Sequence, residues 1–358
     1  MKRLSEKLVE SWTSLGPKFL PFADAASPDL PLSRLLRLSL FQVSVGMALV
    51  LLIGTLNRVM IVELGVPASL VAIMVSLPLV FAPFRALIGF RSDTHRSELG
   101  WRRVPYIWMG TLVQFGGLAI MPFALLVLSG GGQSASAPAW IGQASAALAF
   151  LLVGAGVHIT QTVGLALATD LAPQESQPKV VGLMYVMLLL GMIVSAFVFA
   201  SVLEDFSPGR LIQVIQGCAI TTMILNVLAL WKQETRDRSR RFKNPDQLTF
   251  KESWALFCKG DHAIRRLIAV GLGTMAFTME DVLLEPYGGE ILKLSVGSTT
   301  LLTATLAFGS LIGFGLASKK LSRGADPFRM ASIGALVGIP AFAAVIIAAP
   351  CAILHTRS

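Results

Sequence analysis

The sequence predicts an all-α membrane protein whose chain crosses the bilayer several times. Hydrophobic residues make up 54% of the 358 residues and charged residues 14%, whereas about a quarter of a soluble protein is charged. The mean hydropathy is +0.69. Apolar residues gather in nine stretches, and a bilayer span needs about 20 such residues. Basic residues lie between these stretches, so the net charge of +9 indicates membrane topology and not nucleic-acid binding.

All nine stretches are expected to be helices, because lipid offers no hydrogen-bond partner to open backbone groups. A polytopic protein of this kind places successive loops on opposite sides of the membrane. The predicted spans are 38–60, 67–90, 104–128, 139–169, 180–203, 210–231, 265–286, 296–318 and 328–350.

The distribution of Lys and Arg predicts a cytoplasmic N-terminus. With that orientation, all but five of the 30 basic residues lie in the N-terminal tail or in cytoplasmic loops, as the positive-inside rule requires. The start of the chain lacks the short apolar core of a cleavable signal peptide. Cys218, Cys258 and Cys351 share no metal-binding or redox spacing, and we expect free thiols.

A basic cytoplasmic linker, 232–264, divides the spans into an N-terminal six-helix half, 38–231, and an incomplete C-terminal half of three helices, 265–358. The halves look related. The stretches "LGVPASLVA" (64–72) and "LSVGSTTLL" (294–302) each lead into the second span of a half. Parallel repeats of this kind are typical of secondary transporters.

The cytoplasmic N-terminal tail, 1–37, contains a weak amphipathic pattern. Leu4, Leu8, Trp12 and Leu15 fall on one helical face. The pattern fits a helix lying on the membrane surface, and a flexible basic tail explains it equally well.

The linker contains a second, stronger pattern. Thr249 and Glu252 have the spacing of a capping box, and Phe250, Trp254 and Phe257 follow along one face. This predicts a surface helix that ties the two halves together.

The most specific short stretch is "GFRSDTHRSELGWRRVPYIWMG" (89–110). Gly89 permits close helix approach, Asp93 stands where span two ends, and Arg102 and Arg103 open span three, so acid and base can pair across neighbouring helix ends. The stretch resembles the loop signature Gly-x-x-x-Asp-Arg-x-Gly-Arg-Arg of the major facilitator superfamily, with "THRSELGW" as an insert. The resemblance implies a conformational latch; a simple topology anchor is the alternative.

Longer stretches carry a narrower resemblance. They are "LPLSRLLRLSLFQVSVGMALVLLIGTLNRVMIVELGVPASLVA", "GVHITQTVGLALATDLAP" and "MAFTMEDVLLEPYGG". Together with the loop they are similar to the PucC/LhaA family, the bacteriochlorophyll-delivery branch of the superfamily, over nearly all of 30–350. Within the family the likeness is to the branch that serves the core light-harvesting (LH1) complex. The superfamily fold has twelve spans, so nine imply a shortened chain.

The resemblance implies an assembly factor in the intracytoplasmic membrane of a purple photosynthetic bacterium. It implies bacteriochlorophyll as cofactor, with carotenoid or lipid as further ligands. The implied partners are the LH1 alpha and beta polypeptides, the reaction centre–LH1 core complex, bacteriochlorophyll synthase and membrane lipids.

Charged residues inside predicted spans mark candidate sites, because a charge at mid-bilayer costs roughly 2.5–3.5 kcal/mol. Arg58 lies near the outer end of span one, and Glu280, Asp281 and Glu285 lie near the outer end of span seven. We expect these carboxylates to cap a cavity, with Glu280 or Asp281 paired to Arg58; a solvated helix end is the plain alternative for Glu285. Pro286 and the following glycines are expected to end the helix.

His158 is the only histidine within a predicted span. It forms a polar stripe with Gly154, Gln161 and Thr162. A neutral imidazole could ligate the magnesium of bacteriochlorophyll, with small neighbours making room for the ring; no metal is expected to bind the protein directly. The alternative is a histidine hydrogen-bonded to a neighbouring helix.

Two further charges lie near the cytoplasmic ends of spans. Arg85, in span two, can snorkel or pair with Asp170, at the end of span four. Asp170 is more easily explained as a cap or loop charge than as a proton site.

No enzyme motif supports bond-making chemistry, and the sequence favours a protein that acts by binding. "GLGTMA" (271–276) imitates a dinucleotide fingerprint inside a span, where a strand and phosphate loop have no place. The competing function is a proton-coupled secondary transporter of a small molecule, with Arg58, Glu280 and Asp281 as its coupling residues.

Overall fold

The computed structural model describes residues 22, 25–26, 30–95, 100–130, 138–234, 249–321 and 323–356, with all their side chains except those of 280, 281 and 348–356. These residues form helices joined by turns. Nine helices in this part of the chain are long and apolar enough to cross a membrane, which confirms the predicted fold class. The N-terminal surface helix predicted within 1–37 lies mainly outside the described residues.

The elements follow one another with short connections. Two π-helical segments, η2 and η3, lie in span one, and a 3₁₀ turn, η5, precedes α8. The order is α2 (Leu32–Leu38), α3 (Leu40–Leu49), η2 (Val50–Leu56), η3 (Val59–Glu63), α4 (Ala68–Val80), α5 (Phe84–Thr94), α6 (Val104–Leu128), α7 (Ala139–Leu171), η5 (Gln174–Ser176), α8 (Gln177–Val202), α9 (Pro208–Leu230), α10 (Phe250–Cys258), α11 (Ala263–Glu290), α12 (Val296–Leu321) and α13 (Pro327–Thr356).

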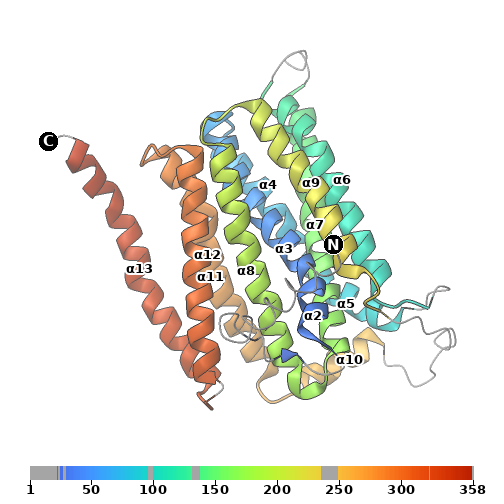
Figure 1. Cartoon of the computed structure of the whole chain (residues 1–358). Coiled ribbons are helices and arrows are strands. Elements are labelled where there is room, and N and C mark those ends of the chain that lie inside the picture. The colour runs from blue at the N-terminus through green and yellow to red at the C-terminus, as the bar shows by residue number, and fades with distance from the viewer. Residues whose placement is uncertain are drawn as a thin grey trace, which may run out of the picture.

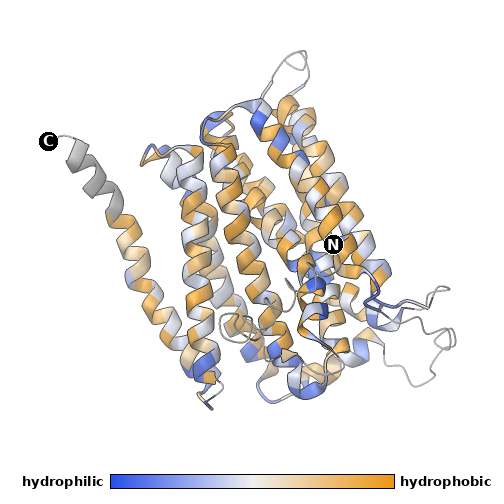
Figure 2. Ribbon diagram, in the orientation of Figure 1, coloured by the Kyte–Doolittle hydropathy of each residue, from blue (hydrophilic) through white to orange (hydrophobic). Residues whose placement is uncertain are grey.

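The long helices from α3 to α12 stand side by side in one bundle, and α13 leans away from it toward its C-terminal end (Figure 1). Helices α7, α8 and α9 pack against α3 of span one, α6 packs on α7 and α9, and α12 packs along α8 to join the two predicted halves. Hydrophobic residues cover the middle of the bundle and hydrophilic residues gather toward its two ends (Figure 2). We call the end where α5 ends and α6 and α10 begin the basic end, because the cytoplasmic loops predicted from their basic residues meet there.

Small residues bring the helices of the first half into close contact. A Cβ atom on Gly156 of α7 would lie 2.4 Å from the backbone nitrogen of Gln114 in α6. One on Gly117 of α6 would lie 2.7 Å from the backbone nitrogen of Val153 in α7. In lipid, such contact between backbones supplies the packing energy that hydrophobic burial supplies in water.

Several helix boundaries differ from the sequence prediction, among them the end of α13, which lies at Thr356 and not at 350. Span one begins at Leu32, because Leu35 and Leu38 are fully buried in the core. Span two is interrupted by a turn at 81–83, close to Pro78 and Pro83. Helix α11 continues through Pro286 and the two glycines that follow it and ends at Glu290, one residue beyond the stretch that was expected to end it.

The predicted capping box at the start of α10 is confirmed. The Thr249 hydroxyl accepts a hydrogen bond from the backbone N–H of Glu252, and the Glu252 carboxylate accepts one from the backbone N–H of Thr249 at 2.7 Å. The ring of Phe250 lies edge-on to Phe90 of α5, with centroids 5.7 Å apart, and Trp254 stacks on Phe257. Helix α10 therefore packs on the N-terminal half while leading into α11.

The cap predicts an acid-sensitive packing of α10. Hydrogen bonds from the backbone and side chain of Thr249 lower the pKa of Glu252. The cap therefore stabilises α10 above the unfolded-state pKa of about 4.3, and this contribution is lost as the pH falls through the lowered folded-state pKa. We expect the fluorescence of Trp254, taken as the difference from a Trp254→Phe variant, to change in this acid range.

A Thr249→Ala variant should show the acid form of this spectrum at neutral pH as well. Lys251→Ala, at an exposed position of the same helix, is the matched control and should titrate like the parent protein. An acid transition that Thr249→Ala leaves unchanged would contradict the role of the cap.

Candidate functional site

The basic end holds a network of ion pairs centred on Arg103. This side chain opens α6 and is 4% exposed. It donates to the Ser92 hydroxyl at 2.7 Å, pairs with Asp93, and places its Nε 2.9 Å from a carboxylate oxygen of Asp170. Three helices, α5, α6 and α7, are thus joined through one guanidinium. The structure brings together Asp93 and Arg103, the acid and base of the loop signature.

Arg102 and Glu234 extend this network. Arg102 pairs with Asp170, so Asp170 holds both arginines. The Glu234 carboxylate, just beyond α9, accepts from the backbone N–H groups of Arg102 at 2.8 Å, Arg103 at 3.0 Å and Val104 at 3.0 Å. These N–H groups have no acceptor within α6, and a negative charge also complements the helix dipole. Glu234 is therefore the cap of α6.

Gly89, the first residue of the loop signature, has a looser environment than expected. A Cβ atom there would lie 3.8 Å from the methyl group of Thr162, which is an ordinary contact. Close helix approach is therefore not what requires glycine at this position, and the sequence interpretation is corrected on that point.

Arg85 lies on the inner face of the bundle, between α5 and α7. Its guanidinium donates to the Thr162 hydroxyl at 2.8 Å and to the side-chain oxygen of Gln161 at 3.1 Å. It bonds to these neutral groups of α7, whereas Asp170 bonds to Arg102 and Arg103 at the helix end. Two members of the predicted polar stripe therefore hold an arginine.

His158, the predicted pigment ligand, is half-buried on the same face of α7. Its Nδ1 is buried and has no hydrogen-bond partner among the described residues, so its lone pair is not engaged by any of them. Gly154 makes room for Pro78: a Cβ on Gly154 would lie 2.3 Å from the Cβ of Pro78 in α4. The nitrogen lone pair has the chemistry of a magnesium ligand, but this nitrogen is closed off from the surface, and the space at Gly154 is filled by a helix contact. Binding of pigment at His158 stays a prediction.

A second polar cluster, which we call the polar seam, joins span one to α11 and α12. Arg58 is 3% exposed; it pairs with Glu63 at 2.5 Å and donates to the backbone oxygen of Leu294 at 3.0 Å. Asn57 donates to the backbone oxygen of Val282 in α11 at 2.6 Å. Each of these side chains leaves span one and ties it to the other half of the protein.

Glu285 is the buried acid of the polar seam. It is 0% exposed and accepts from the Thr303 hydroxyl of α12, so it is not a solvated helix end. Its other oxygen has no partner among the described residues. Gly54 of η2 packs against it: a Cβ there would lie 2.2 Å from a Glu285 oxygen.

The side chains of Glu280 and Asp281 lie outside the described part of the structure. The expected pairing of Arg58 with one of them therefore stays a prediction. The glycines after Pro286 serve packing: a Cβ on Gly289 would lie 2.8 Å from the Nε of Arg58. This contact explains why α11 uses glycine while remaining helical.

Sequence reasoning missed Asn57, Glu63 and Glu234. Glu234 is distant along the chain from the helix that it caps, and nothing in its neighbourhood signals that role. Glu63 stands five residues after Arg58, and a π-helix places residues at that spacing together, whereas the sequence was interpreted with α-helical spacing. The polar Asn57 beside Arg58 in an apolar span was the available signal.

Comparison with known proteins places the chain among proteins of purple bacteria. It is 66% identical to Protein PucC of Rhodovulum sulfidophilum over 348 residues, which are 96% of this chain and 77% of that protein. It is 62% identical to Protein PucC of Rhodobacter capsulatus, over 92% of this chain and 72% of that one. An uncharacterized protein from the puhA-bchM intergenic region of Rhodobacter capsulatus is 56% identical, over 96% and 71%.

No solved structure matches the chain. The family model described as PUCC protein matches residues 55–355, which contain the polar seam, the basic-end network and His158. The chain belongs to the PucC protein family.

Proposed function

We propose that this protein is an assembly factor for light-harvesting complexes of a purple bacterium. Membership of the PucC family is the observation that carries the proposal. The protein is expected to act by binding, without making or breaking bonds, as a multi-pass protein of the intracytoplasmic membrane with its N-terminus in the cytoplasm.

The outer surface of the six-helix half suits a protein that holds apolar partners. A groove of about 560 Å³ opens between α8 and α9, lined by apolar residues such as Met47, Val198 and Phe199. Val198 is 50% exposed there. Grooves on the outside of a bundle can receive membrane helices or pigments, whereas a transporter needs its polar residues around an inner cavity.

The proposed client is the core complex. The partners would be the LH1 alpha and beta polypeptides and the reaction centre–LH1 core, with bacteriochlorophyll synthase as the supplier of pigment. The longer sequence stretches suggested this choice. The identities of 66% and 62% to proteins named PucC and of 56% to the intergenic-region protein do not single out one complex. The test must therefore separate LH1 from the peripheral complex, LH2.

The deciding experiment expresses the chain in a purple bacterium that lacks its own PucC-family genes. Near-infrared spectra of the membranes report LH1 and LH2 separately. We expect LH1 to return. Return of LH2 alone would replace the proposed client by the peripheral complex, and return of neither, with the protein present in the membrane, would overturn the assembly function.

Bacteriochlorophyll is the proposed cofactor, with carotenoid or lipid as further ligands, and His158 is its proposed ligand because its Nδ1 lacks a partner among the described residues. When bound, the pigment would supply no chemistry beyond its light absorption. Gln161 and Gly154 would line the same face of α7. The absorption spectrum of the purified protein should show the pigment, and His158→Ala should lose it.

The polar seam supports a second candidate, a proton-coupled transporter of a small molecule. Arg58, Glu280 and Asp281 would be its coupling residues. Arg58 holds two partners, so we expect the Arg58→Ala protein to be present in the membrane at a lower level. If the protein is an assembly factor, the amount of antenna complex formed per molecule of this variant should stay close to that of the parent protein. Loss of antenna assembly per molecule of Arg58→Ala protein in the membrane would favour the transporter.

A further inference from the structure

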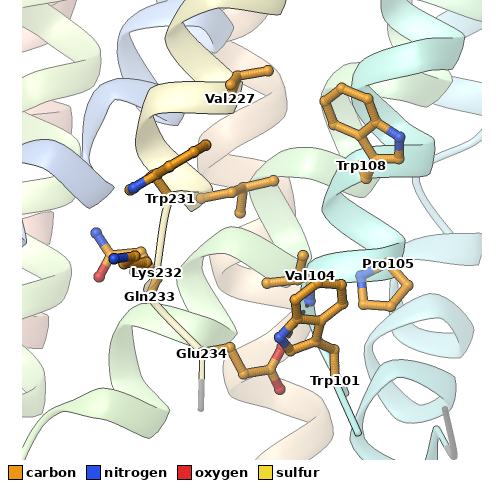
Figure 3. Close-up of a pocket in the computed structure, with 10 residues that line it drawn as sticks. Trp101, Val104, Pro105, Trp108, Val227, Trp231, Lys232, Gln233 and Glu234 are labelled. Atoms are coloured by element: carbon orange, nitrogen blue, oxygen red, sulfur yellow. Dashed lines mark hydrogen bonds between the residues drawn. The ribbon is translucent and has the colours of Figure 1, made fainter. Parts of the chain in front are cut away.

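The groove at the basic end is lined by half of the six tryptophans of the chain. This tryptophan groove has a volume of about 760 Å³ and lies between the start of α6 and the end of α9. Trp101 and Trp108 come from the α6 side, and Trp231 comes from the end of α9, with Val227 one turn before it (Figure 3). Trp108 is 38% exposed and Trp231 60% exposed, so the groove opens to the surroundings of the bundle.

The position of the groove matches the boundary between hydrocarbon and headgroups. Helix α6 begins at Val104 and α9 ends at Leu230, so the groove lies where two spans leave the membrane. Tryptophan is enriched at this depth because its indole combines an apolar ring with a polar N–H. The apolar wall of the groove continues toward the membrane centre along Val227.

The rim of the groove carries excess positive charge. Lys232 is an exposed lining residue. The adjacent Arg34 donates to two neutral oxygens of Gln233, the side-chain oxygen at 3.1 Å and the backbone oxygen at 2.7 Å. Glu234, the acidic residue that lines the groove, accepts hydrogen bonds from the three backbone N–H groups at the start of α6. Among the described residues at the rim, two cations therefore stand beside one carboxylate that already accepts three hydrogen bonds.

We propose that the tryptophan groove binds an anionic phospholipid from the leaflet at the basic end. The acyl chains would lie against Trp108, Val227 and Trp231, and the phosphate would meet Lys232 and Arg34. Basic residues next to a membrane surface attract anionic lipid by about 1 kcal/mol each, which corresponds to about fivefold in affinity. This site goes beyond the proposed function and does not depend on it.

The chemistry of the lining residues favours lipid over bacteriochlorophyll. The magnesium of the pigment needs a lone pair, and an indole N–H and an ammonium group can only donate hydrogen bonds. The Gln233 side chain bonds at both ends to Arg34, and the Glu234 carboxylate caps α6. The groove thus offers apolar walls to acyl chains and cations to a phosphate. Its polar side chains either bond already to other protein groups or have no lone pair to bind magnesium.

The test uses the full chain in nanodiscs that contain brominated phosphatidylglycerol or brominated phosphatidylcholine, at equal bromine content. Bromine quenches nearby tryptophan. We expect stronger quenching by the anionic lipid, with about 25-fold preference from the two cations, and we expect Lys232→Gln to lower this preference about fivefold. Lys259→Gln, another exposed lysine at the basic end, is the matched control and should keep it.

Two further variants locate the signal. Trp231→Phe should reduce the difference between the two lipids, whereas Trp140→Phe, at the opposite end of the bundle and 66% exposed, should leave it unchanged. Equal quenching by both lipids, or equal effects of Lys232→Gln and Lys259→Gln, would overturn the proposal. Energy transfer from Trp231 to bound bacteriochlorophyll, lost in Trp231→Phe, would show pigment in the groove and would also overturn it.

Discussion

Arg103→Ala is expected to lower the free energy of unfolding by roughly 3 kcal/mol, the largest effect that we expect from one substitution at the basic end. The substitution removes the group that joins Ser92, Asp93 and Asp170. Hydrogen bonds to charged groups are worth about 1.5–3 kcal/mol, and breaking a buried ion pair costs about 3–5 kcal/mol. Asp93 remains 52% and Asp170 33% exposed, so water relieves part of the loss and the lower part of that range applies.

Thermal unfolding of the purified protein in detergent measures this effect. Arg91→Ala removes an exposed arginine at the same end of the bundle and is the control for lost charge. Arg103→Lys should fall between the two, because an ammonium group can meet one carboxylate but not all three partners. Equal stability of Arg103→Ala and Arg91→Ala would show that the network contributes nothing to the fold.

Gly54→Val should destabilise the contact between span one and α11 by about 2 kcal/mol or more. The new Cβ would lie 2.2 Å from an oxygen of Glu285, which is fully buried and held by Thr303. Overfilling a packed core typically costs about 1–3 kcal/mol, and here the displaced group is a carboxyl that has little room to move. Thermal unfolding again measures the loss.

A double substitution separates this clash from a general effect of valine in a helix. Gly54→Val combined with Glu285→Ala should be more stable than the sum of the two single effects predicts, because the alanine leaves space for the valine. Gly116→Val, in α6 with nothing within 4 Å of its Cβ, is the matched control and should be close to neutral. Strict additivity in the double variant would mean that Gly54 and Glu285 do not meet.

Hydropathy was sufficient to predict the nine helices, because in lipid a long apolar segment has no alternative to internal hydrogen bonding. The capping box at Thr249 could also be predicted, since its two residues, Thr249 and Glu252, are three positions apart in the sequence. The cap of α6 could not be predicted, because Glu234 reaches it from the segment that follows another span, α9. Local patterns were therefore predictable, and contacts made by packing were not.

The polar residues follow the same division. Arg58, Glu285 and His158 could be singled out because polar groups in an apolar span require an explanation. Their partners could not be predicted. For Arg85 the sequence left snorkelling and pairing with Asp170 as alternatives, whereas in the structure its guanidinium donates to Gln161 and Thr162.

The two π-helical segments of span one have a mechanical consequence. A π turn closes its hydrogen bond over five residues, whereas an α turn closes it over four. Conversion of η2 from π to α geometry would therefore shift the register by about one residue and rotate the following part of the helix by about 100°. Asn57 and Arg58 come directly after η2, so a local rewinding would carry Arg58 and Glu63 round together and turn Asn57 and Arg58 away from the backbone oxygens of Val282 and Leu294, which would loosen the contact of span one with the second half.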